Sequence, residues 1–198
     1  YPTSHEDPRP KFAHYRAHDV LITAATHDHV NIYKTHEEFL KPLRELVSSL
    51  PENGLLVLCA DEKNAQALAK HAKARVVSYG FDKKATWYAG NISRGEKTKF
   101  DLTKDGTLVA KITTSLLGDH NVQNIVGAGA ILLEKNLLSP EQFANAISSF
   151  AGLARRLSKL TKKSSVPAFE GFGSSREKLQ AAIVALKMQF SSSRLVVV

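Results

Sequence analysis

The stretch Leu55–Gly80, "LLVLCADEKNAQALAKHAKARVVSYG", decides the fold class. It begins and ends with a short apolar run, and each run is consistent with a buried strand. The segment between them, Asp61–Ala72, starts with acidic residues, which favour the beginning of a helix. Strand, helix and strand in this order predict two parallel strands joined by a helical crossover.

The same pattern extends toward the N-terminus. The apolar run Asp19–Ala25 predicts another buried strand. Thr35 and Glu38 have the spacing of a capping box, which predicts an amphipathic helix that runs to about Leu50. The order β-α-β-α-β therefore predicts a parallel sheet flanked by helices.

The pattern changes in the second half of the chain. From Thr86 to Leu117 apolar and polar residues alternate, and "KDG" marks a hairpin turn, so we expect a small antiparallel meander. Helices are predicted over Asn121–Glu134 and after Ser139, which is placed as an N-cap with Pro140 in the first helical position.

A strand and helix pattern restarts after Phe150, so we place a domain boundary near Ala151 and expect domains 1–150 and 151–198. The predicted elements are the strands "RRLSKL", "VPAFEGF" and "RLVVV" and the helix "SSREKLQAAIVALKMQF". The chain starts without methionine and stops in an apolar run. We therefore expect an internal fragment of a longer protein.

Composition narrows the class of protein. The 198 residues carry a net charge of +8 and one cysteine, Cys59, which lies in an apolar run and favours a reducing compartment. No stretch is as long as a membrane span, and the first twenty residues are unlike a signal peptide. The positive charges are scattered, with no zinc-finger or RNA-binding signature. We expect a cytoplasmic protein that binds neither membranes nor nucleic acid.

Two polar clusters are candidate sites. "HDH" at His27–His29 directly follows a strand, where α/β folds place functional loops, and supplies two or three candidate metal ligands. "GDHNVQN" places His120, Asn121 and Asn124 at the head of a helix, where an amide can pair with the edge of adenine. Structural interpretations remain open for both: a surface loop for the first cluster, and a helix cap for Asn121.

The basic and glycine-rich segments also leave alternatives open. Arg156 in "GLARRL" is suited to bind phosphate oxygens, but the residues alone favour an exposed strand arginine. "GFGSS" at Gly171–Ser175 is able to present backbone N–H groups to an anion or to form a simple turn with Ser174 as N-cap. The sequence contains no Walker A loop, no G-x-G-x-x-G and no nucleophile elbow.

Three motifs together resemble the Mur ligases, the ATP-dependent amide-forming enzymes of peptidoglycan synthesis. "THDHVNIY" is similar to their D-H-x-D-x-[YF] loop, "GDHNVQNIVGAGAI" to G-x-H-N-x-x-N-x-x-A-A, and "FAGLARRL" to G-x-x-x-R-[FL]. Their order and spacing agree, and the resemblance covers nearly the whole chain. It implies a central domain with a mostly parallel sheet, helices and a small antiparallel meander, followed by the start of a Rossmann-like C-terminal domain.

The first fifteen residues, "YPTSHEDPRPKFAHY", resemble the recycling branch of this family. That branch joins UDP-N-acetylmuramate to the tripeptide L-alanyl-γ-D-glutamyl-meso-diaminopimelate. The alanine-adding branch is the alternative, and folylpolyglutamate synthase would leave the K-F-x-H-Y portion unexplained. An alternative of another class is a non-catalytic module that binds anions or a metal.

The resemblance implies a reaction in which ATP phosphorylates the muramoyl carboxylate and an amino group attacks the acyl phosphate. Mg²⁺ neutralises the phosphates, and catalysis consists of positioning and electrostatics. The residues it implies are His29 for Mg²⁺, Asn124 for adenine with His120 and Asn121 in support, Arg156 for ATP phosphate, and Lys11 and His14 for substrate.

The sequence departs from the family pattern at several positions. Thr26 and Asn31 replace acidic residues around the HDH motif, and Gly171 replaces the Asp that usually holds the ATP ribose. Ser174 and Ser175 replace two histidines. The family's P-loop would lie before Tyr1, so we expect this chain alone to be inactive.

Overall fold

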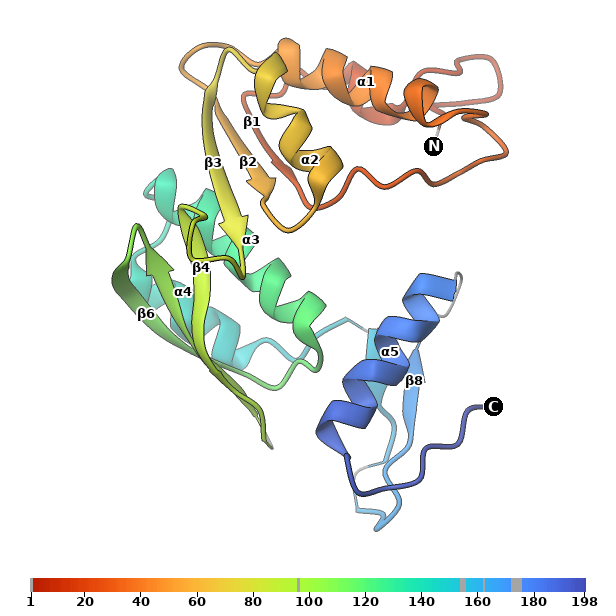
Figure 1. The fold of residues 1–198 in the computed structure, drawn as a ribbon, viewed down its shortest axis with the longest axis vertical. Coiled ribbons are helices and arrows are strands. Elements are labelled where there is room, and N and C mark those ends of the chain that lie inside the picture. The colour runs from red at the N-terminus through yellow and green to blue at the C-terminus, as the bar shows by residue number, and fades with distance from the viewer. Residues whose placement is uncertain (1, 96, 154–155, 162, 172–175) are drawn as a thin grey trace. The chain divides into compact units, whose positions relative to one another are not determined.

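The computed structural model describes residues 2–95, 97–153, 156–161, 163–171 and 176–198 (Figure 1). They form two compact units. Unit 1 contains the residues up to Tyr88, together with Lys104–Gly106 and Val126–Leu137. Unit 2 contains Ala89–Thr103, Thr107–Ile125 and the residues from Leu138 onward. The predicted boundary between 1–150 and 151–198 stays a prediction.

Six strands form one sheet in sequence order, which confirms the mixed α/β class. They are β1 Asp19–Ile22, β2 Leu55–Cys59, β3 Arg75–Gly80, β4 Trp87–Ser93, β5 Thr98–Lys104 and β6 Thr107–Thr114. Neighbours from β1 to β4 are parallel, with Asp19 opposite Leu55, Leu55 opposite Arg75, and Tyr79 opposite Trp87. This is the parallel sheet that the alternating sequence pattern predicts.

One face of the parallel strands in unit 1 is covered by two helices, α1 His36–Ser48 and α2 Lys63–Ala67 (Figure 1). Right-handed crossovers between strands in sequential order place both helices on the same face. The core of this layer is made of small and aliphatic residues: Ile22, Ala25, Leu40, Val47, Leu50, Leu56, Leu58, Ala65, Leu68 and Ala74.

The opposite face of β3 contacts the C-terminal half of α3, Asp119–Glu134. Residues alternate between the faces of a strand, so Arg75, Val77 and Tyr79 share this face. A methyl group added to Gly127 of α3 would lie 2.7 Å from Cζ of Tyr79, so this half of α3 touches the sheet directly. At its end Glu134 accepts hydrogen bonds from Arg75 and Trp87.

Local side-chain chemistry explains where the helices begin. Thr35 accepts a hydrogen bond from the backbone N–H of Glu38 at 3.2 Å and opens α1 as predicted. The Glu38 carboxylate, however, accepts from the backbone N–H of Lys34, one residue earlier than a standard capping box requires. Ser139 and Gln142 form the full capping box that opens α4, Pro140–Ser149.

Three predicted elements differ from the structure. The predicted helix Asp61–Ala72 begins at Lys63 because Glu62 is the N-cap, and it breaks after Ala67 into the 3-10 turn η2 Ala69–His71. Strand β1 ends at Ile22 rather than Ala25, whose N–H donates to the Glu62 carboxylate at 3.0 Å. The predicted strand Arg194–Val198 is wrong, because these residues have no strand assignment.

Unit 2 contains the meander and the C-terminal elements. Asp105 and Gly106 both have positive φ, 47° and 81°, which is the geometry of the predicted two-residue hairpin turn between β5 and β6. Helix α4 packs on β6. Beyond it, β7 Arg156–Lys159 pairs antiparallel with β8 Phe169–Gly171, and α5 Arg176–Gln189 follows.

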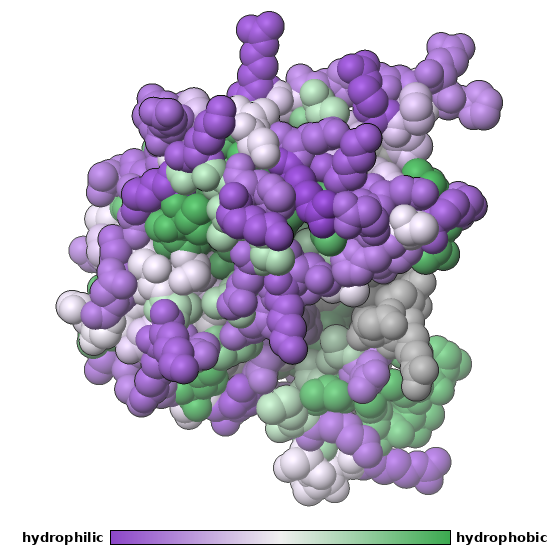
Figure 2. Space-filling model, turned by 45° about the horizontal axis from the view of Figure 1, so that its top comes forward, coloured by the Kyte–Doolittle hydropathy of each residue, from purple (hydrophilic) through white to green (hydrophobic). Residues whose placement is uncertain are grey.

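No helix among the described residues is long and apolar enough to cross a membrane. The face drawn in Figure 2 is mostly hydrophilic, with apolar side chains between polar ones and a group of adjoining apolar side chains at the lower right.

Candidate functional site

The loop His27–Tyr33, here called the HDH loop, is closed on itself. The Nε2 atom of His27 lies 3.0 Å from the backbone oxygen of Tyr33. The backbone oxygen of His29 accepts from the N–H groups of Ile32 and Tyr33 at 2.8 and 3.0 Å. His29 itself has a φ of 56°, which turns the chain sharply at the residue that the family resemblance assigns to Mg²⁺.

The two histidines of the motif therefore have different surroundings. The ring of His27 is stacked on that of His36, with 6.0 Å between the ring centroids, and is tilted against that of Phe39, with 5.7 Å between the centroids. These contacts give His27 a structural role. The His29 side chain is 28% exposed, and its Nε2 lies 3.9 Å from the Asp28 carboxylate.

The described residues do not supply a complete metal site at this loop. Mg²⁺ takes six ligands, mostly oxygen atoms. Within the described part of the chain, no group of three His, Cys, Asp or Glu side chains could hold a metal ion. His29 and Asp28 alone do not make a site for the ion.

The N-terminal residues form a small folded arm. Arg9 binds the Asp7 carboxylate with Nε and Nη2, at 2.9 and 2.7 Å, and His14 Nε2 lies 3.1 Å from the same carboxylate. The hydrogen bond from Arg9 is the main reason that the pKa of Asp7 is lowered far below its usual value. Of the two predicted substrate residues, His14 is therefore paired inside the arm, and Lys11 is exposed.

A pocket of about 110 Å³ joins this arm to the HDH loop, and we call it the His29 pocket. Its lining comes from the arm, the end of β1, the HDH loop and α1: Pro10, Phe12, Ala24, His29, Tyr33, Phe39, Pro42 and Leu43. The N-terminal arm and the HDH loop, which carry the first two motifs of the chain, thus meet in unit 1. The aromatic lining was not predicted from the sequence, although Phe12 and Tyr33 both lie within those motifs.

The second candidate cluster opens α3 in unit 2. Asn121 donates from Nδ2 to the backbone oxygen of Leu117 at 2.7 Å, so its side chain ties the helix to the segment before it. Asn124 is exposed, three residues later on the same face of the helix. The structure therefore gives Asn121 a structural hydrogen bond and leaves Asn124 facing solvent.

The first turn of α3 is held by its neighbours. Gly118 has a φ of 87°, and a methyl group there would lie 2.8 Å from the ring of His120 and 2.9 Å from Cβ of Ala185 in α5. Partial desolvation lowers the pKa of His120, although the neighbouring charge of Asp119 opposes this. Asp119 in turn is bound by Arg94, whose Nε donates at 3.1 Å.

The described parts of the two remaining motifs, which include Gly152, β7 and β8, also belong to unit 2. A methyl group on Gly152, in the "FAGLARRL" segment, would be 2.9 Å from Cδ2 of Leu116. Arg156 begins β7 and pairs with Gly171 of β8, so Arg156–Lys159 and Phe169–Gly171 are adjacent strands. The side chain of Arg156 and the residues Ser174 and Ser175 lie outside the described part.

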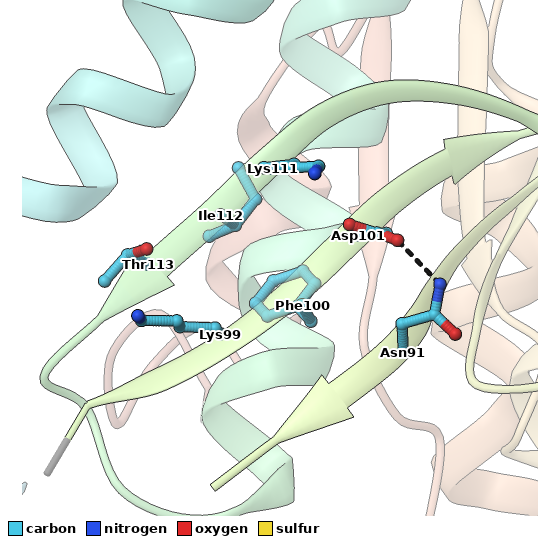
Figure 3. A pocket seen from close by; sticks show the side chains of 7 residues that line it. All are labelled: Asn91, Lys99, Phe100, Asp101, Lys111, Ile112 and Thr113. Carbon is cyan, nitrogen blue, oxygen red and sulfur yellow. Dashed lines mark hydrogen bonds between the residues drawn. The ribbon is translucent and has the colours of Figure 1, made fainter. Parts of the chain in front are cut away.

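A larger pocket of about 210 Å³ lies on the meander, and none of the predicted site residues is among those that line it (Figure 3). It is lined by Asn91, Lys99, Phe100, Asp101, Lys111, Ile112 and Thr113. Asn91 donates to the Asp101 carboxylate at 2.7 Å, and the two lysines do not converge on one point in Figure 3. This depression has no arrangement suited to catalysis.

Comparison with known proteins identifies the class. The family description "Mur ligase middle domain" matches residues 4–132, which is more than half of the chain. The chain therefore belongs to the Mur ligase family.

Individual relatives agree with this assignment. The UDP-N-acetylmuramate–L-alanine ligase of Geobacter sp. (strain M21) is 29% identical over 90% of this chain and 39% of its own length. The chain thus spans about two fifths of this curated relative.

Solved structures share the fold. One is the UDP-N-acetylmuramate:L-alanyl-γ-D-glutamyl-meso-diaminopimelate ligase of Neisseria meningitides, at 23% identity and a TM-score of 0.66, covering 78% of this chain and 47% of that one. Another is the MurF ligase of Thermotoga maritima in complex with ADP, at 14% identity and a TM-score of 0.70, covering 85% and 38%.

Proposed function

We propose that this chain is part of an ATP-dependent ligase that joins UDP-N-acetylmuramate to an amino group through an acyl-phosphate intermediate. The observation that carries the proposal is the match of residues 4–132 to the Mur ligase middle domain. Two contacts within unit 2 support it: a methyl group on Gly152 would lie 2.9 Å from Leu116, just before α3, and β7 pairs with β8. The proposed enzyme acts in the cytoplasm.

In this proposal Asn124 reads the adenine edge, because an exposed amide offers one donor and one acceptor. Asn121 supports it by fixing the start of α3 through its bond to Leu117. His120 packs beside this start, and Arg156 is assigned to ATP phosphate. The ADP complex of the Thermotoga maritima relative is compatible with a nucleotide site in this fold.

Magnesium is proposed together with ATP, because phosphoryl transfer requires neutralisation of phosphate charge. His29 is the residue of this chain assigned to it. The Asp28 carboxylate lies 3.9 Å from its Nε2, and phosphate oxygens and further residues would complete the coordination.

For the acceptor we propose the tripeptide L-alanyl-γ-D-glutamyl-meso-diaminopimelate, which makes this a murein-recycling enzyme with Lys11 and His14 near the substrate. The supporting observation is the N-terminal arm, whose Pro10 and Phe12 share a pocket with His29. L-alanine is the second candidate acceptor, favoured by the identity of 29% to an L-alanine ligase.

The proposal is tested with the full-length protein encoded by the gene. Phosphate release from ATP is measured with UDP-N-acetylmuramate and either the tripeptide or L-alanine. We expect release that depends on both substrates and is faster with the tripeptide. Faster turnover with L-alanine would assign the alanine-adding branch. Absence of a G-x-x-G-K-[ST] loop from the gene upstream of Tyr1 would favour a non-catalytic module instead.

A further inference from the structure

The first turn of α3, residues 119–122, starts without a capping side chain at the position before it. Gly118 precedes the helix and has no side chain that could accept a hydrogen bond, whereas the starts of α1 and α4 have side-chain caps. Only the backbone oxygen of Gly118 is available, and it accepts from the N–H groups of Asn121 and Val122 at 3.1 and 3.4 Å. Helix ends fray, so the order of this turn depends on contacts made by its side chains.

Two side chains of the turn make such contacts. Asn121 donates from Nδ2 to the backbone oxygen of Leu117 at 2.7 Å, which ties the turn to the segment before it. Asp119 accepts from Arg94, whose Nε and Nη2 atoms both donate to Oδ1, the former at 3.1 Å. As an acidic residue in the first turn, Asp119 also interacts favourably with the helix dipole. The Arg94–Asp119 pair thus connects the start of the helix to another element of the fold.

Arg94 is attached to the sheet. It directly follows β4, which lies between β3 and β5 in the six-stranded sheet. The side chain of Arg94 is 34% exposed and that of Asp119 is 43% exposed, so water screens the pair in part. Exposed ion pairs contribute little to the free energy of unfolding. The pair is therefore better suited to orienting the start of α3 than to stabilising the whole protein.

We propose that Arg94 is a positioning residue for nucleotide binding, which holds the first turn of α3 through Asp119 and thereby orients Asn124. This inference rests on the proposed function, in which Asn124 reads the adenine edge. Asn124 comes four residues after His120 and three after Asn121, so both residues of the first turn are its neighbours on the helix surface. Hydrogen bonds weaken with misalignment, and fraying of the first turn would remove the neighbours that restrain the Asn124 amide.

The test measures the Kd for ATP of the full-length protein by calorimetry. Arg94→Gln should raise the Kd about two- to fivefold, because the free energy of an exposed ion pair limits the effect that the contact can transmit. Arg94→Lys keeps the charge and should raise the Kd less. In an Asp119→Asn or an Asn124→Ala background, Arg94→Gln should have no further effect on the Kd, since Arg94 acts through these two residues.

Arg75→Gln is the matched control. Arg75 donates to Glu134 at the other end of the same helix, ten residues or about 15 Å along it from Asn124. This substitution removes the same charge and an ion pair of the same helix, so it should lower stability in urea unfolding and leave the Kd for ATP unchanged.

Three results would overturn the positioning role and leave the proposed function standing. They are an unchanged Kd in Arg94→Gln, an equal rise of the Kd in Arg75→Gln, and an effect of Arg94→Gln that persists in the Asp119→Asn background, as direct contact of Arg94 with the nucleotide would produce. A folded full-length protein that binds no ATP would overturn both the positioning role and the proposed function.

Discussion

Gly127 of α3 lies against the ring of Tyr79 on β3, so closely that a methyl group at position 127 would be 2.7 Å from Cζ and 2.8 Å from Cε2. Tyr79 is fully buried, and the ring has no space to move away. The glycine therefore sets the distance between this half of the helix and the sheet.

From this contact we predict that Gly127→Ala destabilises the protein, although alanine is the better helix former by about 1 kcal/mol. Overpacking of a core costs typically about 1–3 kcal/mol, so after the helix-propensity gain the net loss should be up to about 2 kcal/mol in urea unfolding. Tyr79→Val in the same chain removes the ring. The loss of stability in the double variant should then be smaller than the sum of the losses in Gly127→Ala and Tyr79→Val. Simple additivity would show that contact with the Tyr79 ring does not cause the loss in Gly127→Ala.

Glu134 is the buried anchor at the end of the same helix, with its side chain 5% exposed. It accepts from Arg75 Nη1 at 2.9 Å and Trp87 Nε1 at 2.8 Å, and Lys104 Nζ lies 2.7 Å away. We predict that Glu134→Gln lowers the free energy of unfolding by about 1–3 kcal/mol at pH 7. This is less than for a fully buried pair, because both cationic partners are solvent-exposed.

The effect of Glu134 should depend on pH. Burial alone would raise the pKa of Glu134, but the hydrogen bonds from Lys104, Trp87 and Arg75 outweigh burial and hold it below its ordinary value of 4.5. The stabilisation is therefore present above pH 4.5 and is lost as the pH falls through the lowered value. The stability difference between the unchanged protein and Glu134→Gln should shrink on acidification. Glu52→Gln, at an exposed loop position, should show no such trend.

Gly118 and Gly106 allow strain to be separated from packing, because both have positive φ, 87° and 81°. Nothing lies within 4 Å of a methyl group added to Gly106, whereas one on Gly118 would meet the ring of His120 and Cβ of Ala185. Gly106→Ala should cost about 1 kcal/mol from backbone conformation alone. Gly118→Ala should cost about 1–3 kcal/mol more, measured by urea unfolding of both variants. Equal costs would contradict the packing contact.

These elements show which parts of the fold are predictable from the sequence. The parallel strands and α1 were predictable because apolar runs and capping residues are local signals, and Thr35 and Ser139 act as those signals require. The end of β1 was not predictable. The N–H of Ala25 bonds to Glu62, 37 residues away, and such a contact leaves no trace in local periodicity.

The candidate sites show the same limit. Letters of the HDH motif identify His29, but only the folded chain places Phe12 beside it, since the arm and the loop are separated by more than ten residues. Conversely, His27 has the same residue type as His29 and a different role, which is decided by its bond to Tyr33. The spacing of residues in the sequence identifies candidate site residues, and their contacts in the folded chain distinguish their roles.

Asn121 and Asn124 provide the most direct test of the proposed nucleotide site. Asn121→Ala removes the hydrogen bond to the Leu117 oxygen and should lower the free energy of unfolding by about 1 kcal/mol. Asn124 is exposed, so Asn124→Ala should leave stability within about 0.5 kcal/mol. ATP binding of the full-length protein, measured by calorimetry, should nevertheless weaken by about tenfold in Asn124→Ala, because one or two hydrogen bonds to adenine are lost. Gln142→Ala, which removes a capping amide from α4 outside the proposed site, is the control and should bind ATP unchanged. Unaltered ATP affinity in a folded Asn124→Ala variant would reject the role of Asn124 in reading adenine.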